Sequence, residues 1–100
     1  MLGFAMRAGN LVIGTDLISR AMARGEVKLV VISSGASDST KKKLTVKSEF
    51  YKVTAILLEI DQDELGKLIG KTYSPAAVAV TADGFATEIK KAFAEMKNQD

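Results

Sequence analysis

The segment Val27–Ile32 constrains the fold of this chain more than any other part of the sequence. Its single polar residue is Lys28, and the others are valine, isoleucine and leucine. A strand with one face in water alternates apolar and polar residues, whereas a nearly continuous apolar run is typical of a strand covered on both faces. We therefore predict a central strand here, in a sheet with helices packed against both of its sides.

Helical and strand patterns alternate along the rest of the chain. Further apolar runs predict strands over Val53–Ile60 and Ala76–Thr81, and amphipathic segments between the strands predict helices. This alternation favours a three-layer α/β/α sandwich with a mixed, mostly parallel central sheet, in one domain over residues 1–100. The pattern leaves open whether the loops Ile13–Thr15, Ser33–Asp38 and Lys71–Pro75 share one end of the sheet.

The chain contains neither cysteine nor histidine. Their absence excludes a disulfide framework and thiolate or imidazole metal sites, and it removes the side chains most often used as nucleophile and general base. Only carboxylate and backbone oxygens remain as metal ligands, and only carboxylate, lysine, hydroxyl or tyrosine side chains remain for catalysis. The composition thus disfavours catalysis, and we expect no catalytic residue, no metal site, no cofactor and no enzymatic activity.

Charge is unevenly distributed although the formal net charge is only +2. Residues 1–30 carry four basic and two acidic groups, residues 31–60 five and three, and residues 61–100 five and seven. This asymmetry suits an anionic partner such as a nucleic acid, although an ordinary solvated surface has a similar bias. No apolar run approaches the ~20 residues of a membrane span, and no signal-peptide pattern is present, so we expect a cytoplasmic protein without a membrane partner.

A lysine cluster lies at the start of a helix for which Asp38 or Ser39 is the predicted side-chain cap, and which is predicted to run to about Tyr51. Lys41–Lys43 are suited to phosphate contacts, because each neutralised phosphate releases counterions. The alternative is a solvated helix face, and no aromatic residue is interleaved with these lysines to stack on bases. Leu44, Phe50 and Tyr51 are the residues of this helix available to the core.

The glycine-led helix from Gly14 to Gly25 has an unusually polar start. Leu17, Ile18, Ala21 and Met22 form the predicted buried stripe, and Asp16, Ser19 and Arg20 are predicted to face outward. Free amides at a helix start attract phosphate, Thr15 and Ser19 add hydroxyl donors, and Asp16 with Arg20 combines an acceptor with a planar donor fork. The alternative is an intrahelical ion pair between Asp16 and Arg20, worth ~0.3 to 0.5 kcal/mol.

The segment Gly14-Thr15-Asp16-Leu17, with Arg20 further along, resembles the ribosomal protein L7Ae/L30e superfamily. Members of that superfamily bind kink-turn RNA through a helix that begins Gly-Thr-Asn-Glu and carries a lysine at the Arg20 position. The resemblance also covers Gly25–Ile32, Leu65–Lys71 and Val78–Val80. The opening Leu2–Gly9 and the short chain are most similar to the small bacterial members.

The resemblance implies an RNA-binding protein that recognises kink-turn-like structured RNA without catalysing a reaction. In the superfamily the helix start contacts sheared G·A pairs, the last loop packs against an extruded nucleotide, and a basic residue before the long strand approaches the backbone. The corresponding residues here are Gly14, Thr15, Asp16, Arg20, Lys28, Lys71, Thr72, Tyr73, Ser74, Pro75 and Ala76. Expected partners are a structured RNA, either ribosomal RNA or a riboswitch, and the ribosome itself, and we expect a monomer.

Three residues depart from the superfamily pattern. Asp16 replaces an asparagine and so offers only acceptors, Leu17 replaces a glutamate and offers neither donor nor acceptor, and Pro75 is displaced by one position relative to archaeal members. These changes favour altered guanine contacts. They also motivate the alternative function of a protein–protein interaction module on the same fold with reduced RNA affinity.

Overall fold

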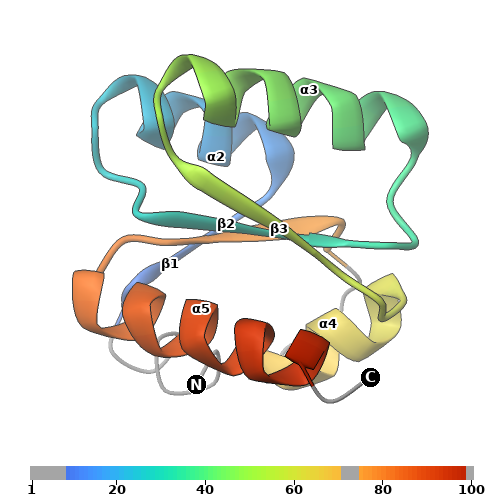
Figure 1. Ribbon diagram of the computed structural model, residues 1–100. Helices are drawn as coiled ribbons and strands as arrows, with labels where there is room; N and C mark the ends of the chain where they lie inside the picture. Colours follow the sequence, from blue (N-terminus) through green and yellow to red (C-terminus); the bar gives the residue numbers. More distant parts are fainter. Residues whose placement is uncertain (1–8, 71–74, 99–100) are drawn as a thin grey trace.

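The computed structural model describes residues 9–70 and 75–98 (Figure 1). Its strands are β1 (Leu11–Ile13), β2 (Leu29–Ser33), β3 (Thr54–Leu58) and β4 (Ala77–Val80). Its helices are α2 (Thr15–Ala23), α3 (Asp38–Phe50), α4 (Gln62–Leu68) and α5 (Asp83–Asn98). No helix in the described residues is long and apolar enough to cross a membrane.

The described strands form a mixed sheet in the order β1-β4-β2-β3. The pair β2 and β3 is parallel, whereas β4 is antiparallel to both β1 and β2. The predicted α/β/α sandwich with a mixed sheet is confirmed, but the expectation that the sheet is mostly parallel is wrong. Continuous apolarity indicates that both faces of a strand are covered, and it carries no information about the direction of the neighbouring strand.

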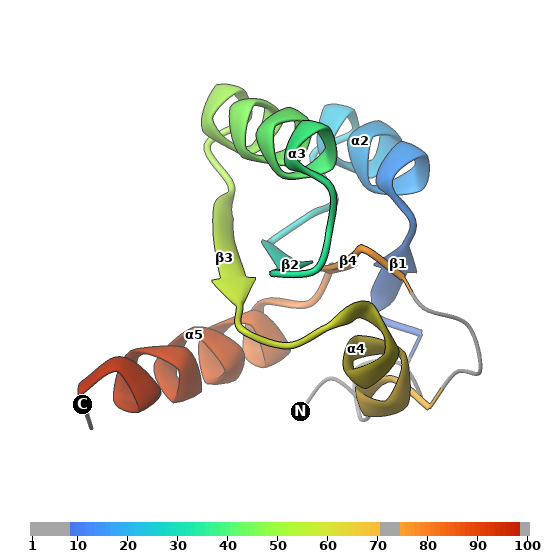
Figure 2. The ribbon, with the colours of Figure 1, turned by 90° about the vertical axis from the view of Figure 1, so that its right-hand side faces the viewer.

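Helices cover both faces of the sheet, as the edge-on view shows (Figure 2). All five residues of β2 are buried. Its side chains alternate between two apolar clusters: Val30 and Ile32 pack with residues of α2 and α3, whereas Leu29 and Val31 pack with residues of α4 and α5. The prediction of a central strand covered on both sides is thus confirmed, and its residues join the two halves of the core.

Four chain segments meet at one edge of the sheet. β1, β2 and β3 end there and β4 begins there, because β4 runs in the opposite direction to the other three strands. We call this the loop edge, made of residues 13–15, 33–37, 59–61 and 75–76. The structure therefore brings the described parts of the three loops to the same end of the sheet, while Lys71, Thr72, Tyr73 and Ser74 lie outside the described residues.

Hydrogen bonds between segments distant in sequence tie the loop edge together. The Ser33 hydroxyl donates to the Ile60 carbonyl at 2.7 Å and accepts from the Gly35 amide at 3.0 Å. The Gln62 side-chain amide donates to the Gly35 carbonyl at 3.1 Å. These bonds connect the turn after β2 to the turn before α4, which holds both in fixed positions beside the start of β4.

Helix α3 differs from the sequence prediction at both of its ends. Its N-cap is Ser37, whose side chain accepts a hydrogen bond from the Thr40 amide, rather than Asp38 or Ser39. At its C-terminal end, Phe50 is 77% exposed and Tyr51 is also exposed, so the expectation that both belong to the core is wrong. Leu44 and Ser48 are the buried residues of this helix, and they leave Phe50 on another face.

Candidate nucleic-acid interface

The backbone at Gly14 determines how helix α2 begins. Gly14 has φ of 103° and ψ of 139°, a conformation that side chains with a Cβ strongly disfavour. A Cβ at this position would meet nothing within 4 Å, so the requirement for glycine comes from the backbone conformation and not from a lack of space. The Gly14 carbonyl accepts the first helical hydrogen bond, from the Ile18 amide at 2.9 Å.

The amides of the first turn of α2 are left open for a ligand. No side chain caps this helix start, and within the described residues the amides of Thr15, Asp16 and Leu17 have no acceptor. The starts of α3 and α4 are instead capped by Ser37 and by Asp61, which accepts from the Glu64 amide at 2.8 Å. Unfilled amides and the positive end of the helix dipole make the start of α2 suitable for binding an anion or a base acceptor.

Asp16 forms an ion pair with the neighbouring helix rather than with its own. Its Oδ1 atom lies 3.6 Å from Nζ of Lys43 on α3, and its side chain remains 85% exposed. Within the described residues Arg20 has no ion pair, so the alternative of an Asp16–Arg20 pair does not apply to this structure. The Arg20 side chain is exposed and its guanidinium is available to a ligand.

Two other residues of α2 do not take the positions predicted from the sequence. Leu17 is 55% exposed, so its expected place in the buried stripe is wrong, whereas Ile18, Ala21 and Met22 are buried as predicted. The Ser19 hydroxyl oxygen is buried and has no hydrogen-bond partner within the described residues. Ser19 is therefore not the outward donor that the sequence indicated.

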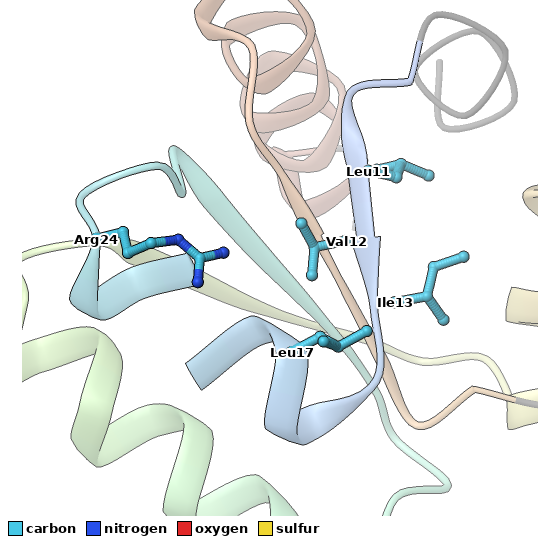
Figure 3. A pocket seen from close by; sticks show the side chains of 5 residues that line it. All are labelled: Leu11, Val12, Ile13, Leu17 and Arg24. Atoms are coloured by element: carbon cyan, nitrogen blue, oxygen red, sulfur yellow. The ribbon is translucent and has the colours of Figure 1, made fainter. Parts of the chain in front are cut away.

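Leu17 is exposed because it lies on the side of α2 that faces β1, the outermost described strand of the sheet. It lines an open hollow together with Leu11, Val12, Ile13 and Arg24. Figure 3 shows Leu17 and Arg24 extending toward edge strand β1. Since no described strand follows β1 on that side, nothing in the described chain covers Leu17 completely.

The last loop reaches the same edge as the start of α2. Pro75 is buried and Ala76 is partly buried, and the Ala76 carbonyl accepts a hydrogen bond from the Ser33 amide at 2.9 Å. β1 and β4 are neighbours, with Ile13 opposite Val78, so Gly14 and Ala76 follow and precede adjacent strands at one edge. The structure thus brings together Gly14, Thr15, Asp16 and the described end of the last loop.

Lys28 lies at the opposite end of the sheet. It directly precedes β2, its amide donates to the Val80 carbonyl at 2.8 Å, and its side chain is exposed. The five residues of β2 separate it from the loop edge by about 17 Å, at ~3.3 Å per strand residue. The structure therefore does not bring Lys28 to the start of α2.

Lys43 is a site residue that the sequence interpretation did not connect with Asp16. The sequence singled out Lys41–Lys43 as a group, but the contact with Asp16 joins residues on two separate helices. Helical periodicity relates residues three or four positions apart and gives no signal for a pair this distant. Only the packing of α2 against α3 places this ammonium beside the helix start.

Most of the chain is similar in sequence to known proteins. The model of the Ribosomal protein L7Ae/L30e/S12e/Gadd45 family matches residues 1–90. The RNA-binding protein YlxQ of Bacillus subtilis is 39% identical over 89 residues, which cover 89% of this chain and 87% of that protein. YlxQ of Enterococcus faecium is 35% identical over 91% of this chain and 85% of its own length.

Solved structures show the same fold. A protein of unknown function from Bacillus halodurans C superposes with a TM-score of 0.84 at 34% identity, covering 90% of this chain and 89% of that chain. The 15.5kD RNA binding protein of Giardia lamblia superposes with a TM-score of 0.78 at 14% identity, over 97% of this chain and 82% of that one, which shows similarity of fold alone.

These comparisons confirm the resemblance that the sequence indicated. Two more distant relatives, at 28 and 30% identity, are the large ribosomal subunit protein eL30 of Sulfolobus acidocaldarius and of Archaeoglobus fulgidus, over 79 and 78% of this chain and 76 and 86% of those proteins. The family is one of RNA-binding and ribosomal proteins rather than enzymes, in agreement with the expectation for this chain. Three observations point to the same family: the match to the family model, the relatives at 35 to 39% identity, and the mixed sheet with helices on both faces. The chain belongs to the Ribosomal protein L7Ae/L30e/S12e/Gadd45 family.

Proposed function

We propose that this protein binds structured RNA and recognises a kink-turn or a similarly bent internal loop. The observation that carries the proposal is the uncapped start of α2, where the amides of Thr15, Asp16 and Leu17 are open at the loop edge. The relatives named RNA-binding protein support the broader part of the proposal. The finer part, recognition of a kink, rests on the superfamily resemblance of Gly14, Thr15 and Arg20.

The chemistry of the helix start suits the edges of unpaired or sheared bases. Its amides donate to phosphate or base acceptors, and the Arg20 guanidinium is a planar fork that matches the two acceptors of a guanine edge. RNA exposes such edges where a loop or bulge interrupts the helix, because side chains cannot read the deep major groove of an intact RNA duplex. A bent internal loop is therefore a better ligand for this site than a regular duplex.

Asp16 and Leu17 are expected to change how a guanine is held. The Asp16 carboxylate accepts hydrogen bonds from the guanine amino group, and the adjacent Lys43 ammonium offsets part of its repulsion for phosphate. Leu17 replaces hydrogen bonding with apolar contact to a base. We propose that recognition persists with these altered contacts.

The loop Lys71–Ala76 is proposed as the second contact, packing against the extruded nucleotide beside the helix start. Lys28, at the far end of β2, contacts the backbone of a flanking stem only if the RNA extends that far along α2. The cognate RNA is proposed to be ribosomal RNA or a riboswitch, bound by a cytoplasmic monomer. The more distant relatives named large ribosomal subunit protein eL30 motivate the ribosomal part of this proposal.

A mobility-shift titration tests the proposal. A kink-turn RNA is compared with a copy whose G·A pairs are replaced by Watson–Crick pairs, and the protein is expected to bind the first RNA much more tightly. Arg20→Ala is expected to weaken binding of the kink-turn RNA by about 5- to 150-fold, equivalent to ~1 to 3 kcal/mol, while thermal stability changes little. Equal affinity for the two RNAs, or no binding of either, contradicts the proposal.

A protein–protein interaction module is the second candidate function, and one observation favours it. Phe50 is 77% exposed and contacts Tyr51 edge-to-face, with a ring-centroid distance of 4.9 Å, and Val46, four residues before Phe50 on α3, is also exposed. Exposed apolar side chains that lie near one another are typical of contact surfaces. Light scattering of the wild type and of Phe50→Ser over a range of concentrations tests whether this surface joins two copies. An increase in mass with concentration for the wild type alone supports self-association.

A further inference from the structure

The two helical layers of the protein differ in charge. Helices α2 and α3 together carry five basic and three acidic residues, whereas α4 and α5 together carry five acidic and four basic ones. Figure 2 shows α2 and α3 side by side on one face of the sheet and α4 and α5 on the other. An anionic polymer bound at the start of α2 is therefore attracted to the α2 and α3 layer.

The two flanks of α2 also differ from each other. On the β1 side lie the exposed Leu17 and Arg24, and the Arg24 guanidinium is already paired with the carboxylate of Glu26. On the α3 side, Lys43 is likewise paired, with Asp16, but within the described residues Arg20 and Lys47 have no ion pair. A phosphate backbone leaving the helix start thus meets an apolar hollow on one side and an ammonium group on the other.

The basic flank continues for a further helical turn. Arg20 lies four residues after Asp16 on α2, and Lys47 lies four residues after Lys43 on α3, so each extends the face that carries the ion pair. The two helices run in the same direction, because each returns from the loop-edge end of a strand and β1 and β2 point the same way. Further along, the buried contact of the Ser48 hydroxyl with Met22 Sδ, at 3.8 Å, holds the two helices together.

We infer that Lys43 and Lys47, with Arg20 opposite them, form a track for the phosphates of the RNA stem that leaves the bend. This inference rests on the proposed function, and it adds a direction: the stem crosses α2 toward α3 and not toward β1. Lys43 has two effects in this arrangement. It attracts phosphate, and it offsets the Asp16 carboxylate, which would otherwise repel the backbone at the helix start.

Salt dependence of RNA binding is the measurement that tests the track. Lys43→Gln/Lys47→Gln is compared with Lys90→Gln/Lys91→Gln, which removes the same charge from exposed positions on α5. Two lost phosphate contacts are expected to lower the slope of log K against log salt by ~1.4 to 1.8, and to weaken binding about 10- to 30-fold near physiological salt. The α5 variant is expected to keep the wild-type slope.

Two RNAs separate the inference from the proposed function. The titrations are run with the kink-turn RNA and with a regular RNA duplex, and circular dichroism confirms that each variant is folded. If the wild type does not prefer the kink-turn RNA, the proposed function is contradicted. Even then, a slope of log K against log salt that falls only in the Lys43 and Lys47 variant, on either RNA, supports the track. Equal slopes for the two double variants on both RNAs overturn it.

Discussion

Lys43 Nζ lies 3.6 Å from Asp16 Oδ1 and joins α3 to the open start of α2. Both side chains are substantially exposed, so the pair adds little to the free energy of unfolding, in the range of ~0 to 1 kcal/mol. Its larger effect is on the charge at the helix start. A carboxylate beside three unfilled amides would repel an anionic ligand, and the lysine partly neutralises it.

Asp16→Asn is expected to tighten binding of a kink-turn RNA. The change removes a negative charge near the phosphates, supplies the donor that the carboxylate lacks, and releases Lys43 for the RNA. We expect an increase in affinity of about 5- to 30-fold, corresponding to ~1 to 2 kcal/mol of binding free energy, in mobility-shift titrations. Glu88→Gln, on exposed α5, is the control for the charge change alone, and an equal gain in that variant would argue against a local effect.

Gly14→Ala is expected to destabilise the fold. The positive φ of 103° costs an alanine ~1 to 3 kcal/mol, although its Cβ would meet no other atom within 4 Å. Urea denaturation measures the effect. Gly84→Ala is the matched control, because Gly84 lies in α5 without a positive φ and with equal space for a Cβ, so alanine there is expected to be neutral or to stabilise by ~0.5 to 1 kcal/mol.

Ser33→Ala is expected to lower stability by ~1 to 3 kcal/mol, because it removes a buried hydroxyl from the loop edge. This hydroxyl donates to the Ile60 carbonyl and accepts from the Gly35 amide, and the substitution leaves the Gly35 amide without its acceptor. Ser34→Ala removes only a longer bond, of 3.2 Å, to the same Ile60 carbonyl. Thermal unfolding should therefore shift clearly for Ser33→Ala and little for Ser34→Ala, and comparable shifts would contradict this assignment.

Lys52→Gly is expected to stabilise the protein. Lys52 has φ of 59° at the end of α3, where its amide donates to the Glu49 carbonyl at 3.2 Å and the Val53 amide donates to the Ser48 carbonyl at 2.8 Å. Glycine adopts this left-handed conformation without the steric cost that lysine pays, so we expect a gain of ~1 kcal/mol in chemical denaturation. Lys52→Ala separates the loss of charge from the backbone effect, and an equal gain in that variant would refute the backbone explanation.

Local patterns in the sequence predicted β2, β3 and β4 and the helices that pack on them, but not the short edge strand β1. The apolar run in β2 indicated a strand covered on both faces, and Ile18, Ala21 and Met22 are buried as the helical spacing predicted. These predictions succeeded because the spacing of apolar residues depends on the geometry of a single helix or strand.

The candidate site was predictable only in part. The sequence singled out Gly14, Thr15, Asp16 and Arg20, and the structure shows their helix start uncapped and Arg20 unpaired within the described residues. The sequence did not show that Lys28 and the start of α2 lie at opposite ends of the sheet. The separation arises because β1 and β2 point the same way, and the relative direction of two strands is not encoded by residues adjacent in sequence.

By itself, the sequence indicated the strands β2, β3 and β4, the helices between them with their mostly apolar faces, and a helix with a polar start after Gly14, but it did not indicate edge strand β1. Only the tertiary structure decided that β4 runs antiparallel to its neighbours, that Leu17 is exposed beside edge strand β1, and that Lys43 meets Asp16. The physical reason is the range of the interactions. Periodicity reports burial within one element, whereas exposure at an edge and ion pairs between helices depend on which elements the chain brings side by side.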